Sequence, residues 1–174
     1  MDLSLAKCTI EKLDLLLEIS KATFRDAFEH LNDPEDFQAY LEQAFDREKI
    51  ENELKNNEIF YYLVYNRRTP VGYFKLNAAA AQTDISDPDS LEIERIYVCK
   101  EYQGLKIGNW MITQILNLAR RKEIYYLWLG VWEENKDAIR FYQKLGFRKF
   151  KEHPYYIGKD EQTDWLMRFD IPKL

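Results

Sequence analysis

The sequence predicts a single α/β domain, residues 1–174, in which strands and helices are mixed in one layered structure. Strand-forming and helix-forming segments follow one another along the whole chain. Within them, residues 91–132 read as a strand, a glycine turn, a helix and a strand, which together make a βαβ unit. With 174 residues, 46% of them hydrophobic, the chain can bury one sizeable core.

The first third of the chain is predicted to be mainly helical. Thr9 precedes apolar residues that recur at helical spacing and is therefore expected to cap a helix. Asp33 before Pro34 places a capping side chain ahead of a proline at the first helical position. The elements expected here are a strand at 3–8, a helix after Thr9, and helices at about 34–44 and 46–56.

From residue 59 onward the chain favours strands. Residues 59–65 and 71–76 are rich in aromatic and β-branched side chains and flank a turn at 66–70, which predicts a β-hairpin. The polar stretch 81–90, with Pro88 inside it, is predicted to be a loop. The remaining expected elements are strands at 91–98, 125–132, 147–157 and 163–170, and helices at 106–122 and 135–145.

A glycine-bearing turn joins strand 91–98 to the next helix, with the sequence Glu101-Tyr102-Gln103-Gly104-Leu105-Lys106-Ile107-Gly108. A turn that ends on a helix N-terminus presents unpaired N–H groups at the positive end of the helix dipole, which suits a phosphate or pyrophosphate. Because the right-handed crossover makes the two flanking strands parallel, the turn lies at the carboxyl end of its strand, where open α/β sheets bind ligands.

Composition excludes several classes of function. The formal net charge of −5 argues against nucleic-acid binding, which needs a basic face, and tolerates a cationic partner. Cys8 and Cys99 stand alone, so neither a disulfide framework nor a metal site is expected. The N-terminus lacks the pattern of an export signal, and no run reaches the ~20 apolar residues of a membrane helix. We therefore expect a soluble, cytoplasmic protein without a membrane or nucleic-acid partner.

A second segment follows the glycine turn, with the sequence Asn135-Lys136-Asp137-Ala138-Ile139-Arg140-Phe141-Tyr142-Gln143-Lys144-Leu145-Gly146-Phe147. Together the two segments resemble the GNAT superfamily of acetyl-CoA-dependent N-acetyltransferases. The family patterns are (Gln/Arg)-x-x-Gly-x-(Gly/Ala) and, further on, Asn-x-x-Ala-x-x-Phe-Tyr-x-x-x-Gly-Phe. Gln103 and Gly108 match the ends of the first pattern, and Lys106 replaces its middle glycine. A lysine keeps the backbone donors, adds charge beside a phosphate, and leaves the sign of φ there for the structure to decide. The second pattern is matched throughout, by Asn135, Ala138, Phe141, Tyr142, Gly146 and Phe147.

The resemblance implies a fold and a substrate class. The GNAT fold is a central mixed, mostly antiparallel sheet with a parallel βαβ core that binds acetyl-CoA, and flanking helices. Segments 91–97, 128–133 and 161–164 are also similar to the bacterial PaiA-type spermidine/spermine N-acetyltransferases. This closer likeness implies a polyamine, or another small cationic amine, as acetyl acceptor, and a possible homodimer.

The resemblance also implies roles for named residues. The N–H groups from Gln103 to Asn109 would hold the pyrophosphate of the cosubstrate acetyl-CoA, and the backbone at 96–98 would pair with its pantetheine arm. Asn135 would hydrogen-bond the pantetheine, and Tyr142 would protonate the departing thiolate. The residues expected to bind the cofactor are Ile96, Tyr97, Val98, Gln103, Gly104, Leu105, Lys106, Ile107, Gly108, Asn109, Asn135, Ala138 and Tyr142, without a metal.

Two carboxylates are candidates for deprotonating the acceptor. Glu92 and Glu94 point to the same side of their predicted strand, since side chains two residues apart share a face. A polyamine with an amine pKa of about 10.4 must lose a proton before it attacks, and either glutamate, acting through water, can accept it. The sequence leaves the choice between them open. The alternative is that both belong to the solvated face of an edge strand.

Other functions and residues are weighed against this hypothesis. The same chemistry on a protein N-terminus or lysine is one alternative, and a non-catalytic CoA-binding regulatory module is another. Trp132 at a strand end is a candidate for lining the acceptor pocket, whereas Cys99 is rejected as a nucleophile. An acidic rim that attracts cations is a further hypothesis, built from Glu29, Glu35, Asp36 and Glu42.

Overall fold

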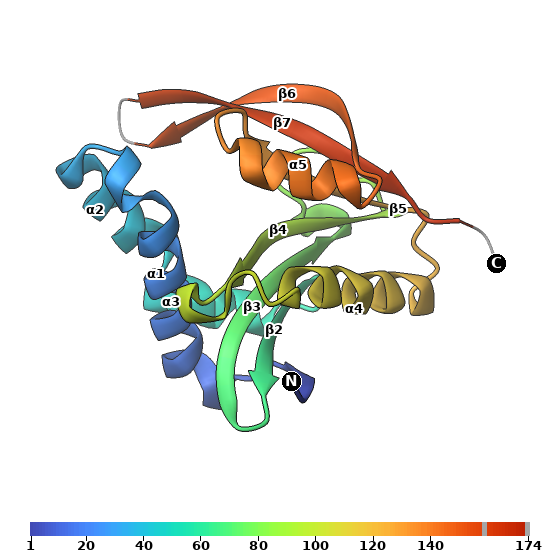
Figure 1. Ribbon diagram of the computed structural model, residues 1–174, viewed down its shortest axis with the longest axis horizontal. Coiled ribbons are helices and arrows are strands. Elements are labelled where there is room, and N and C mark those ends of the chain that lie inside the picture. The colour runs from blue at the N-terminus through green and yellow to red at the C-terminus, as the bar shows by residue number, and fades with distance from the viewer. Residues whose placement is uncertain (158–159, 173–174) are drawn as a thin grey trace.

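A seven-stranded sheet runs through the protein in this computed structural model, which describes residues 1–157 and 160–172 (Figure 1). Residues 158, 159, 173 and 174 of the predicted domain lie outside the described part. The strands are β1 (Leu3–Lys7), β2 (Ile59–Asn66), β3 (Thr69–Ala78), β4 (Ser90–Val98), β5 (Tyr126–Trp132), β6 (Arg148–Ile157) and β7 (Asp160–Asp170). The longer helices are α1 (Leu13–Phe28), α2 (Pro34–Ala44), α3 (Arg47–Lys55), α4 (Ile107–Arg121) and α5 (Lys136–Lys144).

The strand order is β1-β2-β3-β4-β5-β7-β6, and β4–β5 is its parallel pair while the other neighbours are antiparallel. The predicted mixed, mostly antiparallel sheet is thus confirmed. Strands β4 and β5 pair only from Ser90 to Glu92 against Tyr126 to Trp128, although β4 continues to Val98 and β5 to Trp132. The two strands therefore separate after Glu92, which leaves facing backbone edges unpaired with each other.

Helices cover both faces of the sheet (Figure 1). The larger hydrophobic cluster joins α4 and α5 to one face through residues such as Met111, Ile115 and Ile139. On the opposite face, α1 and α3 pack through Leu16 and Ile50 onto β2 and β3. An aromatic and aliphatic cluster joins α1 to α2 beside them. The separation of β4 and β5 consequently lies between two layers of helices.

The predicted helix starts are mostly confirmed. Asp33 accepts hydrogen bonds from the N–H groups of Glu35 and Asp36 at the start of α2, and Asp46 accepts one from Lys49 at the start of α3. The prediction for Thr9 is wrong in its detail, because its side chain makes no capping hydrogen bond. It precedes a 3₁₀ turn, Ile10–Lys12, and this tighter turn leads into α1.

Several strand boundaries differ from the sequence prediction, most clearly at the β2–β3 turn and at the start of β7. The β2–β3 turn is shorter than expected, since β2 ends at Asn66 and β3 begins at Thr69. Arg67 lies in this tight turn and adopts the left-handed conformation, with a φ of 58°. Strand β7 begins at Asp160 rather than 163, because its first residues continue the antiparallel ladder with β6. Neither change alters the order of the elements.

Candidate active site

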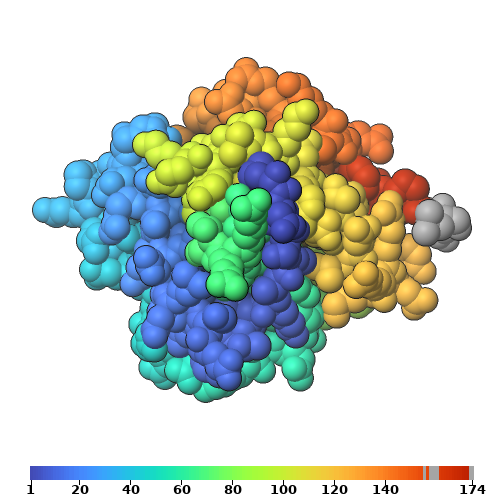
Figure 2. Space-filling view, turned by 60° about the horizontal axis from the view of Figure 1, so that its bottom comes forward, coloured from blue at the N-terminus to red at the C-terminus, as the bar shows by residue number. Residues whose placement is uncertain are grey.

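The glycine turn lies at the protein surface, next to the β2–β3 hairpin (Figure 2). A short 3₁₀ turn, Lys100–Tyr102, leads into it, and α4 begins at Ile107. The first N–H groups of α4 have no acceptor within the helix. The Gln103 side chain donates to the Val98 carbonyl over 3.2 Å, which ties the turn to the end of β4. The predicted anion-binding segment is therefore held at the carboxyl end of its strand.

Lys106 adopts a left-handed backbone conformation, with φ at 61°. This decides the point that the sequence left open: φ is positive where the family pattern has glycine. A non-glycine residue in this region costs about 1–2 kcal/mol. In return, Lys106 places an ammonium group at the N-terminus of α4, where the helix dipole already favours an anion. Gly104 is also left-handed, with φ at 77°.

Gly108 allows α4 to approach α5 closely. A Cβ atom built at this position would lie 3.2 Å from Cζ of Phe141. Ile107 beside it is 1% exposed and belongs to the core. Of the predicted cofactor residues in this segment, Ile107 can therefore offer only its backbone, whereas Leu105, Lys106 and Asn109 are exposed.

The end of β4 has the free backbone edge that a pantetheine arm needs. Ile96, Tyr97 and Val98 pair with β3 on one side, and none of them pairs with β5 on the other. The half-buried Tyr97 ring stacks on Tyr73 at 5.8 Å and meets Phe24 of α1 edge-on, and removal of its hydroxyl from solvent raises the pKa of Tyr97 well above its ordinary value. The backbone edge of β4 at 96–98 is thus free to bind a ligand, while the side chains of these residues pack on the two faces of the sheet.

Helix α5 brings Asn135, Ala138 and Tyr142 together. Asn135 caps the helix by accepting the Ala138 N–H over 3.2 Å, so the amide group left to bind a ligand is its Nδ2. Tyr142 is 9% exposed and packs edge-on against Phe141 and Phe147. Burial raises the pKa of the Tyr142 phenol. The group therefore stays protonated at physiological pH, as a proton donor must.

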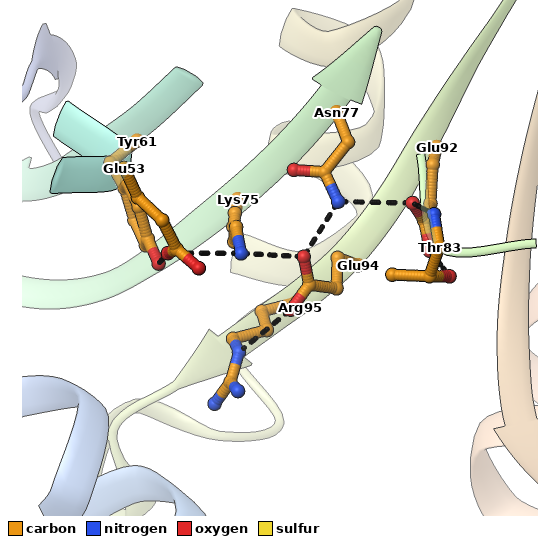
Figure 3. Close-up of polar contacts among 8 residues, drawn as sticks. All are labelled: Glu53, Tyr61, Lys75, Asn77, Thr83, Glu92, Glu94 and Arg95. Carbon is orange, nitrogen blue, oxygen red and sulfur yellow. Dashed lines mark hydrogen bonds and ion pairs between the residues drawn. The ribbon is translucent and has the colours of Figure 1, made fainter. Parts of the chain in front are cut away.

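Both candidate carboxylates lie on β4 and contact Asn77 of the neighbouring strand β3 (Figure 3). Asn77 on β3 donates from Nδ2 to Glu92 Oε2 over 3.0 Å and to Glu94 Oε2 over 2.6 Å. A bulge makes this possible, since Lys75 pairs with Arg95 and Leu76 with Ile93, which leaves Glu94 as the extra residue. Glu92 is 3% exposed on a central strand, so the alternative of a solvated edge-strand face is wrong.

The two carboxylates have different electrostatic surroundings. Glu94 forms ion pairs with Lys75 at 2.6 Å and Arg95 at 3.4 Å. Although burial acts to raise its pKa, these cations outweigh burial and hold the pKa of Glu94 below its ordinary value. Burial raises the pKa of Glu92, and hydrogen bonds from Thr83 and Asn77 offset only part of that rise. Glu92 is therefore the stronger base of the two.

A chain of buried contacts continues from Glu94 to α3 (Figure 3). Lys75 also pairs with Glu53 at 3.0 Å, and Glu53 accepts the hydroxyl hydrogen bond of Tyr61 at 2.5 Å. Our sequence reasoning missed Lys75 and Asn77. The signal that could have revealed them is two polar residues at alternate positions of a strand whose other residues are mostly apolar.

A hollow of about 340 Å³ lies between the end of α1 and the β5–α5 connection. Trp132 and Asn135 are among its lining residues, and a role of Trp132 in the acceptor pocket stays a prediction. Its other lining residues are Ala27, Phe28, His30, Leu31, Glu134, Lys136, Asp137 and Arg140. The four acids of the predicted rim are not among them. Glu134 pairs with Lys136 at 3.4 Å and Asp137 pairs with Arg140, so the charges of this hollow are balanced.

Cys8, Cys99 and His153 are the other reactive residues to consider. Burial raises the pKa of Cys99, as it raises that of Cys8 to about 11, and both shifts disfavour a thiolate nucleophile. His153 pairs with Asp84 at 3.1 Å. Across residues 1–157 and 160–172 there is no cluster of three or more potential metal ligands. In that same part, no helix has the length and apolar character required to span a membrane.

Comparison with known proteins identifies the class of protein. The model of the acetyltransferase (GNAT) family matches residues 16–147. An uncharacterised N-acetyltransferase in the pepI 3' region of Lactobacillus delbrueckii subsp. lactis is 37% identical over 152 residues, which cover 87% of this chain and 88% of that protein. The chain therefore belongs to the GNAT acetyltransferase family, and its cosubstrate is acetyl-CoA.

More distant relatives are informative about the fold. The spermidine N(1)-acetyltransferase of Thermoplasma acidophilum is 24% identical over 85% of this chain and 89% of its own length. The crystal structure of PaiA N-acetyltransferase from the same organism, in complex with coenzyme A, superimposes with a TM-score of 0.78 at 22% identity, covering 98% of this chain and 99% of that one. The Escherichia coli ribosomal-protein-S18-alanine N-acetyltransferase superimposes with a TM-score of 0.73 at 13% identity, covering 99% and 96%. Both structures share the fold.

Proposed function

We propose that this protein acetylates a primary amine of a polyamine, such as spermidine or spermine, by direct attack on acetyl-CoA in a ternary complex. The observation that carries the proposal is the pair of glutamates, Glu92 buried and Glu94 half-buried, at the point where β4 and β5 separate. One of them has a raised pKa and the other is held ionised. The similarity to a spermidine acetyltransferase supports the choice of acceptor.

The two carboxylates fit the two needs of a cationic nucleophile. An alkylammonium, with an ordinary pKa of about 10.4, must lose a proton before nitrogen can attack the thioester. In the proposal Glu92 takes that proton, and Glu94 remains an anion that attracts the ammonium group. This assigns different tasks to two residues that the sequence could not distinguish.

The later steps use the end of β4 and α5. An N–H of the unpaired β4 edge polarises the acetyl carbonyl and stabilises the oxyanion that forms when the amine adds. Collapse of this intermediate breaks the carbon–sulfur bond, and the Tyr142 hydroxyl gives its proton to the departing thiolate. The second proton that the amine nitrogen loses as the amide forms returns to the Tyr142 oxygen through water. Asn135 positions the pantetheine through its Nδ2 group. The N–H groups from Gln103 to Asn109, with the Lys106 ammonium, hold the pyrophosphate.

A thiol-release assay with acetyl-CoA and a panel of amines tests the proposal. The panel contains spermidine, spermine, putrescine, an aminoglycoside and a lysine peptide. We expect turnover confined to the polyamines and strongly reduced in Glu92→Gln. Preferential acetylation of the peptide would instead assign the protein to the protein-modifying acetyltransferases. Binding of acetyl-CoA without acetylation of any amine would favour the non-catalytic CoA-binding module.

A further inference from the structure

We propose that the Thr83 hydroxyl relays the proton between the exposed surface of the site and the buried Glu92 carboxylate. This inference rests on the proposed function, in which Glu92 is the base. Glu92 is 3% exposed, so an acceptor amine or a water molecule cannot readily reach its oxygens. Thr83 is exposed and hydrogen-bonded to it. The threonine therefore connects a buried base to solvent.

Thr83 binds both oxygens of Glu92. Its hydroxyl donates to Oε1 over 2.5 Å, and its backbone N–H donates to Oε2 over 2.8 Å. Asn77 donates to Oε2 from the other side, so Glu92 is held between β3 and the loop that follows it (Figure 3). The hydroxyl oxygen of Thr83 keeps lone pairs with which to accept a hydrogen bond from water or an amine.

The flanking residues hold Thr83 in place. Gln82 is 6% exposed and accepts hydrogen bonds from Trp128 Nε1 at 2.5 Å and from the Ser90 hydroxyl at 2.8 Å. On the other side, Asp84 pairs with His153 of β6 at 3.1 Å. The loop is thus anchored to β5, β4 and β6. Because Trp128 is the register partner of Glu92 on β5, these anchors also place Thr83 on the Glu92 side of the sheet.

The relay moves one proton in two linked transfers. The ammonium, directly or through one water molecule, gives a proton to the Thr83 oxygen as the original hydroxyl proton passes to Glu92 Oε1. The result is a neutral amine, an unchanged threonine and a neutral glutamic acid. Burial and the nearby charge of Glu94 favour uptake of a proton by Glu92, whereas the hydrogen bonds from Thr83 and Asn77 oppose it in part. Glu94 on the same strand is anionic, while Asn77 on β3, Thr83 in the loop and Trp128 on β5 are uncharged.

The test compares Thr83→Val with Thr83→Ser. Valine keeps the shape and the backbone N–H bond but loses the hydroxyl, whereas serine keeps both. We expect Thr83→Val to lower kcat for spermidine about 10- to 100-fold, within the range that proton transfer contributes to catalysis. The KM for acetyl-CoA should stay unchanged. Because the valine variant lacks a donor to the ionised carboxylate, the acid limb of its kcat/KM profile should move to higher pH. Thr83→Ser should keep a kcat and a pH profile of kcat/KM close to those of wild type.

Thermal unfolding of both variants provides the structural control. If Thr83→Val keeps the wild-type rate and pH profile, Glu92 exchanges its proton by another route and the inference is wrong. Equal impairment of the valine and serine variants also contradicts it, since only one lacks the hydroxyl. If the wild-type enzyme acetylates no amine, the proposed function fails and the relay fails with it. If the wild-type enzyme turns over, either of the first two outcomes rejects the relay through Thr83 and leaves the proposed function standing.

Discussion

Among single residues, the protonation state of Tyr142 and the backbone conformation of Lys106 depend most on the structure around them. Tyr142 is one of twelve tyrosines in the chain, and its place on α5 among Phe141 and Phe147 gives it a buried, protonated hydroxyl. Lys106 holds a backbone conformation that ordinarily selects glycine. Both residues can be tested by removing one chemical feature at a time.

Tyr142→Phe removes the proposed acid without changing the packing of the ring. We predict that kcat falls about 100-fold, the lower part of what positioned acids contribute, with little change in the KM for acetyl-CoA. Because burial raises the pKa of Tyr142, ionisation of this phenol should not limit activity at moderately alkaline pH. Steady-state kinetics of Tyr142→Phe and of Tyr156→Phe, an exposed tyrosine on β6, provide the comparison. Equal kcat values for both variants and wild type would exclude Tyr142 as the acid.

Lys106→Gly should have opposite effects on stability and on binding. Relief of the left-handed strain, about 1–2 kcal/mol, exceeds the entropic cost of glycine, about 0.5–1 kcal/mol. We therefore predict a modest gain in unfolding free energy. Loss of the ammonium should weaken acetyl-CoA binding about 3- to 10-fold, because it removes a charge beside the proposed pyrophosphate site. Denaturant unfolding and calorimetric titration measure the two effects.

Glu123→Gly is a matched control for Lys106→Gly. Glu123 has a φ of 56° and follows the other end of α4, far along the helix from the glycine turn. It should show the same gain in stability with unchanged acetyl-CoA affinity. If both variants weaken binding equally, the strain or mobility of α4 determines affinity, and the charge of Lys106 does not.

At the scale of elements, the buried ion pairs join α3, β3 and β4. Lys75 lies between Glu53 and Glu94 with 5% of its side chain exposed. Replacing it with methionine leaves Glu53 without its cation and Glu94 with Arg95 alone, and the loss of one partner of a buried pair costs about 3–5 kcal/mol. We predict a loss of this size in the unfolding free energy of Lys75→Met at neutral pH.

The pH dependence of this loss follows from the lowered pKa of Glu94 in wild type. A lowered pKa contributes stability above the ordinary pKa of glutamate, and that contribution disappears as the pH falls through the folded-state value. The stability difference between wild type and Lys75→Met should therefore shrink as the solution is acidified. Denaturant unfolding at several pH values measures it. A difference that stays constant with pH would show that lost packing, rather than lost charge, destabilises the variant.

The contact between α4 and α5 can be tested at Gly108. Alanine raises helix propensity by about 1 kcal/mol, but its Cβ would press on the Phe141 ring 3.2 Å away. We predict that Gly108→Ala weakens acetyl-CoA binding, because α4 must shift from α5, and that Phe141→Leu in the same chain recovers much of the loss. Titration of the two single variants and the double variant forms the cycle. Additive effects would mean that this contact does not position the turn.

At the scale of the whole molecule, the sequence predicted the architecture better than the site. Periodicity and a cap such as Asp33 located the main strands and helices, since these signals are local. The bulge at Glu94 and the hydrogen bonds from Asn77 to the two glutamates depend on strand register, which the alternation of polar and apolar residues does not reveal. The sign of φ at Lys106 likewise comes from the packing of the turn. The single domain and the homodimer stay predictions.

In the proposed reaction Glu92, rather than Glu94, deprotonates the acceptor. The most direct test is the pH dependence of kcat/KM for spermidine in wild type, Glu92→Gln and Glu94→Gln. We predict a wild-type acid limb whose pKa lies above the ordinary range of glutamate, since burial raises the pKa of Glu92. Glu92→Gln should lose this limb and about 100-fold in rate, while Glu94→Gln should keep a limb and mainly raise the KM for spermidine. A wild-type limb that survives in Glu92→Gln and disappears in Glu94→Gln would contradict the claim.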